Sequence, residues 1–358
     1  MKRSKLLGLQ ILRGLAAWFV VFQHINQAYF DWKPPLKFME IFNYGGFGVD
    51  IFFVLSGFIM YYSVKHNKKG GISFFIDRFF RVFPVYWFMT IVLVLSAALL
   101  PLDSYDTSYT ANTLIKSFLL IPSENPNGLG TYPFLYVGWT LAYEMLFYLI
   151  LSISLLIYKK RAILISTIIL CILPIVLGNF LLLGNSNNLL FEFVLGIFIA
   201  HSYVFISSTK YFDFILKPIV SIPISLTLIV IFAVGIKVLG YNFKTQLLGA
   251  SSIIAIFLII ENLIRDKVIF KKLVVLGDIS YSTYLIHPII LGWFKILFVS
   301  NDSSVIKNLI ILVFIYLVYF LSKLSYKHIE VNNEIFSFKE KVKKLKILNI
   351  KQSSSTTT

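Results

Sequence analysis

Residues 135–157 read LYVGWTLAYEMLFYLILSISLLI, a stretch in which Glu144 is the single charged side chain. A transmembrane helix needs about 20 consecutive apolar residues, so this stretch predicts a membrane-spanning helix that carries a carboxylate. The whole chain has the same character: 58% of its 358 residues are hydrophobic, 14% are charged, and the mean hydropathy is +0.80. Soluble domains are about half apolar and a quarter charged, which excludes an ordinary soluble enzyme.

Similar windows of roughly 17 to 23 mostly apolar residues recur along the chain. They lie at 8–28, 46–64, 82–100, 135–157, 162–178, 188–206, 218–239, 245–262, 279–299 and 305–325. The sequence therefore predicts an all-α, polytopic membrane helix bundle with about ten transmembrane helices. We expect residues 1–330 to form this membrane domain and residues 331–358 to form a basic, disordered cytoplasmic tail.

The distribution of positive charge predicts the orientation. The net charge is +16, and 25 of the 33 Lys and Arg residues lie in segments on one side of the predicted spans, against seven on the other. The side richer in Lys and Arg is expected to be cytoplasmic, which places both termini there. This pattern also argues against a nucleic-acid partner. The single cysteine, Cys171, excludes an internal disulfide and a multi-cysteine metal site, and we expect no metal.

Ionisable residues within the spans are the first candidates for function, because charges are costly in a bilayer. Arg13 and His24 are eleven residues apart in the first window. This spacing returns to nearly the same helix face, roughly 16 Å along the axis. Arginine binds phosphate or carboxylate, and histidine transfers protons near neutral pH. The structural alternative is that Arg13 pairs with a carboxylate such as Asp50 and that His24 is an interfacial histidine.

A second candidate pair lies in residues 77–84, which read DRFFRVFP. If this segment is helical, Arg78 and Arg81 are i,i+3 neighbours on one face. Two guanidinium groups on one face suit a pyrophosphate or a sugar phosphate. The alternative is that these arginines only anchor the cytoplasmic end of the third span.

The segment Gly138-Trp139-Thr140 precedes Glu144 in the window at 135–157. A carboxylate inside a span must be protonated or matched with a cation. We expect its partner to be His24 or Arg13. Such a carboxylate can orient a histidine or accept a proton itself, and the structural alternative is a buried bond to Arg13.

Residues 277–288 read GDISYSTYLIHP and predict a polar helix face. Ser280, Tyr284 and His287 recur at i, i+4 and i+7 on that face. Interhelical hydrogen bonding explains Tyr284, whereas His287, beside the helix-kinking Pro288, is the stronger site candidate.

Residues 45–58 read GGFGVDIFFVLSGF and open the second predicted helix. Gly48 and Gly57 are expected to permit close helix approach. Asp50 is expected to satisfy Arg13 or a backbone group.

Together these motifs resemble the acyltransferase-3 family of integral membrane acyltransferases, which O-acetylate bacterial surface polysaccharides and related acceptors. The likeness covers about residues 5–330. It rests on five features in the family's order: Arg13 with ten residues before His24, the GVDIFFVLSGF run at 48–58, Arg78 and Arg81 before Pro84 and Tyr86-Trp87, the segment from Trp139 to Glu144 with Thr140 in place of the family's serine, and Ser280-Tyr281 before His287-Pro288. The ending departs from the family's Glu-x-Pro, because this chain reads Glu330-Val331-Asn332.

The resemblance implies a bacterial cytoplasmic-membrane enzyme with acetyl-CoA, or another acyl-CoA, as co-substrate. The implied acceptor is a sugar hydroxyl on a polysaccharide or a lipid-linked saccharide. Arg78 and Arg81 would bind the phosphates of the donor. The implied catalytic residues are His24, Glu144 and Arg13. The candidates for substrate or oxyanion contacts are Asp50, Trp139, Tyr281 and His287.

Two other classes of function stay open at this point. Intramembrane Arg, His and Glu residues also form relays in proton-coupled transporters of saccharides or small anions, and a polysaccharide-synthesis scaffold needs no chemistry. The sequence leaves open the sugar, the hydroxyl position, acyl groups other than acetyl, covalent against direct transfer, and the oligomeric state.

Overall fold

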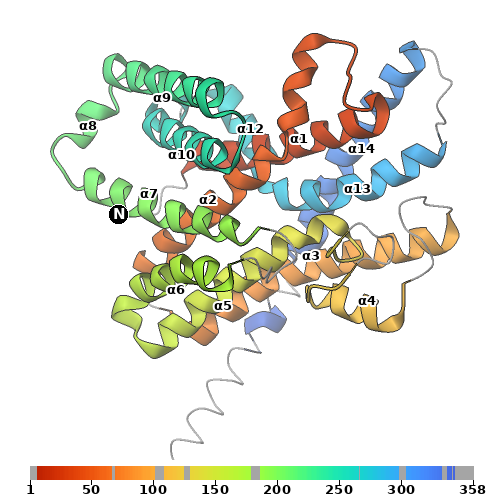
Figure 1. Cartoon of the computed structure of the whole chain (residues 1–358), viewed down its shortest axis with the longest axis horizontal. Coiled ribbons are helices and arrows are strands. Elements are labelled where there is room, and N and C mark those ends of the chain that lie inside the picture. The colour runs from red at the N-terminus through yellow and green to blue at the C-terminus, as the bar shows by residue number, and fades with distance from the viewer. Residues whose placement is uncertain are drawn as a thin grey trace, which may run out of the picture.

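The computed structural model describes residues 6–66, 69–100, 109–124, 130–178, 186–265, 267–297, 304–332, 337–340 and 342. These residues form helices and connecting segments, with no strand among them (Figure 1). The main helices are α1 (Leu7–Phe30), α2 (Phe47–His66), α3 (Gly71–Leu99), α5 (Trp139–Ile157), α6 (Ala162–Leu177), α7 (Leu190–Ser207), α9 (Pro218–Leu239), α10 (Phe243–Ile259), α13 (Ser280–Leu297) and α14 (Ser304–Ser325).

Shorter helical segments connect or flank these helices. They are η1 (Lys37–Tyr44), α4 (Ala111–Phe118), η2 (Tyr136–Gly138), η3 (Lys159–Arg161), η4 (Asn187–Leu189), α8 (Phe212–Ile215), α11 (Glu261–Ile264), α12 (Val268–Asp278) and η5 (Tyr326–Glu330).

The predicted all-α, polytopic membrane bundle is confirmed, with one main helix in each of the ten windows. In the described part of the chain, eight helices are long and apolar enough to span a membrane. Helices α12 and α13 are separated by a bend of 61°. If the two are counted together as one broken span, the number rises to nine. Helix α10 is shorter, with 17 residues.

The predicted start of the third helix at residue 82 was wrong. Helix α3 begins at Gly71 and runs for 29 residues, because the charged segment before residue 82 continues the helix beyond its apolar stretch. A hydropathy window records only the apolar part.

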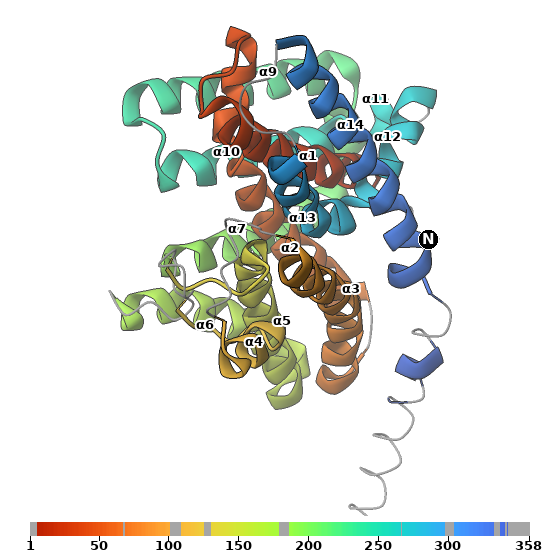
Figure 2. The ribbon, with the colours of Figure 1, turned by 90° about the vertical axis from the view of Figure 1, so that its right-hand side faces the viewer.

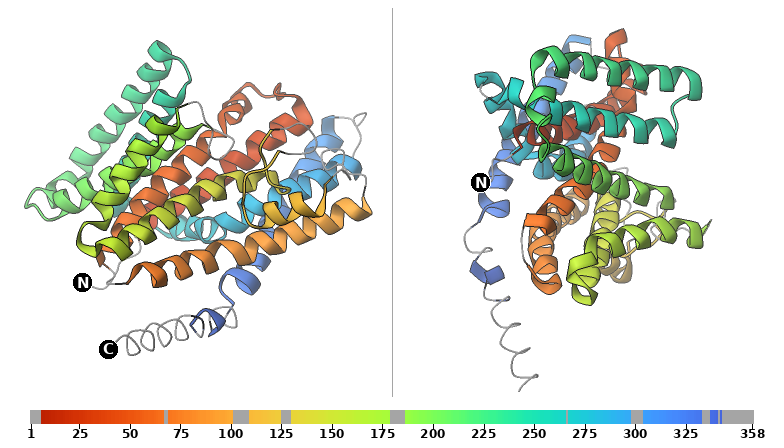
Figure 3. Two further views of the ribbon diagram at one scale, coloured as in Figure 1. Left: turned by 60° about the horizontal axis from the view of Figure 1, so that its bottom comes forward. Right: turned by 90° about the vertical axis from the view of Figure 1, so that its left-hand side faces the viewer.

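Helix α1 lies at the centre of the bundle and contacts α2, α10, α12 and α13 (Figure 2). Helices α9 and α10 pack together at one edge, and α3 runs along the other (Figure 3). We call the end of the bundle where α2 ends, α3 begins and the connection at 158–161 lies the basic end. The end that holds the connections at 31–46 and 240–242 is the far end.

Helices α2 and α7 approach each other closely at two glycines. A Cβ atom on Gly57 would lie 2.1 Å from the carbonyl oxygen of Phe193, and one on Gly196 would lie 2.0 Å from that of Val54. A Cβ atom on Gly48 would lie 2.4 Å from the carbonyl oxygen of Ala16 in α1. The expectation that Gly48 and Gly57 permit close helix approach is therefore confirmed.

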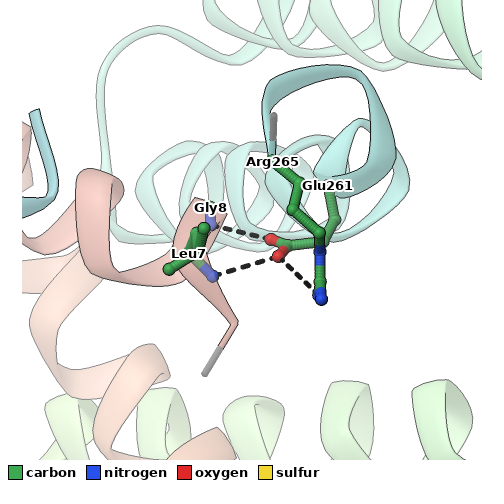
Figure 4. A network of polar contacts seen from close by, with 4 residues as sticks. All are labelled: Leu7, Gly8, Glu261 and Arg265. Carbon is green, nitrogen blue, oxygen red and sulfur yellow. Dashed lines mark hydrogen bonds and ion pairs between the residues drawn. The ribbon is translucent and has the colours of Figure 1, made fainter. Parts of the chain in front are cut away.

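The start of α1 is fixed by a residue from α11. Glu261 accepts hydrogen bonds from the backbone amides of Leu7 (3.1 Å) and Gly8 (2.7 Å), and Arg265 pairs with it at 3.1 Å (Figure 4). These amides have no partner within their own helix, and a carboxylate at a helix N-terminus also interacts favourably with the helix dipole. One buried side chain thus joins the first helix to a segment late in the chain.

We expect Glu261→Ala to lower the stability of the folded bundle by about 2 kcal/mol or more, because two amides and Arg265 lose a charged acceptor. Thermal unfolding in detergent measures this effect. Glu40→Gln, at an exposed position of η1, is the control and is expected to leave the unfolding temperature unchanged. Equal unfolding temperatures for Glu261→Ala and wild type would contradict this role.

Beyond η5, residues 337–340 form a helical turn beside the start of α3. Lys339 Nζ lies 2.6 Å from Asp77 Oδ1, and the ring of Phe338 lies 5.9 Å from that of Phe80. The predicted division of the chain at residue 330 stays a prediction, since most of residues 331–358 lie outside the described residues.

Candidate functional site

A cavity of about 260 Å³ lies between α1, α2, α3, α5 and α13. Five of the nine candidate catalytic, donor-binding and oxyanion residues line it together: Arg13, Arg78, Arg81, Glu144 and Tyr281. Other lining residues are Gln10, Val49, Phe52, Phe53, Leu55, Ser56, Ile59, Met60, Val82, Thr140, Leu141, Tyr148, Ser280 and Tyr284. The lining is cationic toward the basic end and mainly apolar toward the far end.

The arginines come from two helices. Because α3 begins at Gly71, Arg78 and Arg81 lie within one helix and project to the same side, as their spacing predicts. The guanidinium of Arg78 lies over the rings of Phe74 (5.5 Å) and Tyr148 (5.8 Å), a cation–π arrangement that fixes its plane.

The guanidinium groups that line the cavity are available to bind an anion. Arg81 is exposed at the edge of the cavity. None of Arg13, Arg78 and Arg81 belongs to an ion pair within 4 Å among the described residues. The Nε atom of Arg78 is buried without a hydrogen-bond partner. This arrangement leaves guanidinium donors available for an anionic ligand.

Two carboxylates interact with the arginines at longer range. Glu144 accepts hydrogen bonds from Ser56 Oγ (2.9 Å) and from the hydroxyl of Tyr148, and its charge interacts with that of Arg13. The expected neighbour Arg13 is thus present, whereas His24 is not among the hydrogen-bond partners of Glu144 given by the structure. Glu330 accepts from Ser282 Oγ (2.5 Å) and also interacts with Arg13. Sequence reasoning missed Glu330 as a cavity neighbour.

His24 and His287 form a pair beyond the far end of the cavity. Their rings stack at 5.2 Å with an interplanar angle of 27°, and Tyr136 meets His24 edge-on at 5.7 Å. His287 Nδ1 lies 3.2 Å from the carbonyl oxygen of Thr283. Since a carbonyl only accepts, Nδ1 carries the proton and Nε2 presents a lone pair. That Nε2 atom is buried and has no hydrogen-bond partner in the described structure.

The second histidine has a comparable arrangement. His24 Nδ1 lies 3.2 Å from Gln27 Oε1. An amide oxygen also only accepts, so this contact favours the tautomer with a bare Nε2. His24 is half-buried, whereas His287 is fully buried. Neither histidine lines the cavity, so the structure places the arginines and the histidines in two separate groups.

Trp139 and Tyr281 differ in their positions. Trp139 packs against Phe53 (6.3 Å) and Tyr143 (5.9 Å) between α5 and α2 and does not line the cavity. Tyr281 lines the cavity, and its hydroxyl donates to the carbonyl of Val82 at 2.8 Å. A Tyr281 donor to an oxyanion would have to release this bond first.

The sequence predicts Arg13 or a backbone group as the partner of Asp50; the structure gives it a backbone hydrogen bond and no contact with Arg13. Val49 lines the cavity, and Asp50 points to the other side of α2, where it meets Glu192 of α7. Asp50 is 5% exposed and Glu192 is 0% exposed. A side-chain hydrogen bond joins the two carboxyl groups, which therefore share a proton, and no other described residue donates to Asp50 Oδ2 or to either carboxyl oxygen of Glu192. The pair lies at the far end of the tight α2–α7 contact.

We expect Asp50→Asn to leave the stability of the bundle within about 1 kcal/mol of wild type, because the amide of asparagine can donate to Glu192 in place of the shared proton. Asp50→Ala is expected to lower it by about 1–3 kcal/mol, because Glu192 then keeps no partner for its buried carboxyl. Thermal unfolding at neutral pH measures both variants. Equal unfolding temperatures for the two variants would contradict a hydrogen bond between Asp50 and Glu192.

Comparisons with known proteins agree with these features. A family model described as an acyltransferase domain, type 3, matches residues 6–323. The "Exopolysaccharide production protein ExoZ" of Rhizobium meliloti is 35% identical over 144 residues, which are 40% of this chain and 41% of ExoZ. The "Putative acetyltransferase ORF330" of Acidianus two-tailed virus is 23% identical over 284 residues, 77% of this chain and 80% of that protein. No solved structure matches. The chain thus matches about two fifths of the length of ExoZ.

Proposed function

Because this chain belongs to the acyltransferase-3 family of integral membrane proteins, we propose that it transfers an acetyl group from acetyl-CoA to a sugar hydroxyl. The acceptor we propose is a surface polysaccharide or a lipid-linked saccharide, and the names of the two relatives support an acetyl group and an extracellular polymer. The observation that carries the proposal is the cavity, in which three arginines lie at one end and a histidine pair lies just beyond the other.

Acetyl-CoA matches the two ends of the cavity, of which one is lined by arginines and the other is mainly apolar. Coenzyme A carries a pyrophosphate and a ribose phosphate, which match the guanidinium groups of Arg78 and Arg81, and its arm is uncharged. Pockets that enclose drug-sized ligands measure about 300–1,000 Å³, and the cavity measures about 260 Å³. It therefore accommodates the acyl group and part of the arm, while the nucleotide stays outside at the exposed Arg81.

The reaction we propose is direct transfer. His24 Nε2 takes the proton of the sugar hydroxyl as the oxygen attacks the thioester carbonyl. Collapse of the tetrahedral intermediate breaks the C–S bond, and the proton passes to the leaving thiolate. Gln27 holds the Nδ1–H of His24 and thereby orients the ring. Arg13 lies roughly 16 Å from His24 along α1, so its proposed role is to bind the phosphates of the donor together with Arg78 and Arg81, with Glu144 as its counter-charge.

The proposed orientation follows from this donor. Acetyl-CoA is made in the cytoplasm, so the basic end, next to Arg78 and Arg81, faces the cytoplasm of a bacterial cytoplasmic membrane. The excess of Lys and Arg on that side also supports a cytoplasmic location of the basic end. His24 then lies toward the outer leaflet, where a surface saccharide is within reach.

The test uses the purified full chain in detergent with radiolabelled acetyl-CoA. Deacetylated surface polysaccharide and lipid-linked oligosaccharides serve as separate acceptors. We expect acceptor-dependent release of CoA together with label in one acceptor. Binding of acetyl-CoA is measured in parallel. A protein that binds no acetyl-CoA and labels no acceptor, but takes up saccharide in proteoliposomes, would establish a transporter and overturn the proposal.

A further inference from the structure

The wall between the cavity and the histidine pair is formed by Tyr284. This residue lines the cavity and is 5% exposed. Its ring lies 5.9 Å from that of His287 on one side and 6.1 Å from that of Phe52 on the other. Since His287 does not line the cavity, Tyr284 lies between this space and His287, whose ring stacks on that of the proposed base, His24.

The ring of Tyr284 is held in place by a bridge between helices. Its hydroxyl lies 3.1 Å from the carbonyl oxygen of Val137 and 3.1 Å from Thr140 Oγ1. All three groups are buried, where such bonds exclude water and fix a side chain. The bridge connects α13 to the start of α5.

The same short segment also touches the histidine side. Val137 belongs to η2, and the preceding residue, Tyr136, meets the ring of His24 edge-on. An acceptor bound beside His24 therefore lies against the segment that holds Tyr284. The wall is thus linked to the side from which the acceptor arrives.

Two aromatic rings, those of Phe52 and Tyr284, line the far end of the cavity. The side chains there are Val49, Phe52, Thr140 and Tyr284, with the arginines at the opposite end. A donor whose phosphates meet the arginines points its acyl group at Tyr284. The length of the acyl group that fits is then fixed by this ring.

We propose that Tyr284, held by Thr140 and Val137, is the specificity-determining residue that limits the acyl group to a short chain and shields the thioester from water. This inference rests on the proposed function. It adds to that function a limit on the length of the acyl chain. It also gives Tyr284 a role beyond the interhelical hydrogen bonds that the sequence predicts for it.

The experiment measures binding of acetyl-CoA and butyryl-CoA to the purified full chain, together with CoA release without acceptor. We expect wild type to bind butyryl-CoA at least about tenfold more weakly than acetyl-CoA. A methylene group for which a pocket has no space lowers the affinity by about tenfold or more. Tyr284→Ala is expected to remove most of this difference. Thr140→Val keeps the ring but removes one bond of the bridge, and is expected to raise acceptor-independent CoA release.

The matched control is Tyr143→Phe, which is one turn from Thr140 on the same helix. Tyr143 is buried, and its hydroxyl bonds to the carbonyl of Ser186 at 3.3 Å, away from the cavity. This variant is expected to retain the wild-type preference and the wild-type rate of CoA release. If Tyr284→Ala does not purify as a folded protein, Tyr284→Leu gives the same test with an apolar side chain.

The two hypotheses fail in different ways. A wild type that prefers acetyl-CoA and Tyr284 variants with the same preference would overturn the chain-length limit alone. A wild type that binds butyryl-CoA as well as acetyl-CoA would do the same. A wild type that binds neither acyl-CoA would overturn the proposed function and the limit with it.

Discussion

His24→Gln is expected to lower acceptor-dependent CoA release by about 10²- to 10⁴-fold, the range that general-base catalysis contributes. The amide of glutamine cannot take the proton of a sugar hydroxyl. Because His24 does not line the cavity, the dissociation constant of acetyl-CoA is expected to stay unchanged. The measurement is the initial rate with a saturating acceptor, alongside acetyl-CoA binding.

His201→Gln is the matched control for this experiment. His201 lies on α7 and its Nδ1 is 3.0 Å from the hydroxyl of Tyr61, remote from the pair formed by His24 and His287. Its variant is expected to turn over like wild type. Equal rates for the His24 and His201 variants would remove His24 from the chemistry, and His287, with its bare Nε2, would become the candidate base.

Arg78→Ala is expected to raise the dissociation constant of acetyl-CoA by about 10- to 100-fold, because a charged hydrogen bond to phosphate contributes about 1.5–3 kcal/mol. Arg78→Lys is expected to restore part of the affinity, since lysine keeps the charge but lacks the planar fork that lies over Phe74 and Tyr148. Binding titrations at fixed ionic strength measure both variants.

The control separates a phosphate site from general positive charge. Arg161 lies in η3, is exposed at the basic end and does not line the cavity. Arg161→Ala removes the same charge from the same end of the bundle and is expected to bind acetyl-CoA as wild type does. Equal losses in the two alanine variants would mean that Arg78 only anchors its helix at the membrane surface.

Much of the fold could be predicted because the bilayer imposes a length and a composition on each span. The ten windows each hold a main helix, and the glycines of the second window do lie at close helix contacts. The limits of the apolar pattern are visible in α3, which extends eleven residues before the predicted start at 82, and in the bent pair α12 and α13. The hydropathy pattern predicts which residues lie in the lipid bilayer, but it does not predict where a helix begins or ends.

The site was predictable as a set of residues but not as an arrangement. Spacing on one helix put Arg78 beside Arg81, and the structure agrees. Partners on different helices follow from packing, which a sequence pattern does not contain. For this reason the sequence assigns Asp50 to Arg13 or a backbone group and does not indicate that it faces Glu192. No pattern indicates that the ring of Tyr284 lies between the cavity and His287.

The hydrogen bonds from Leu7 and Gly8 to Glu261 span more than 250 residues of chain, and this has a consequence for biogenesis. A ribosome that adds about 5–20 residues per second needs roughly 13–50 s to make that length. During this time the first helix is in the membrane without its cap, and Arg13 lacks the helix that carries Tyr281. Assembly of the centre of the protein therefore follows insertion of its later spans, and a chain interrupted before residue 261 leaves its first helix as a target for membrane quality control.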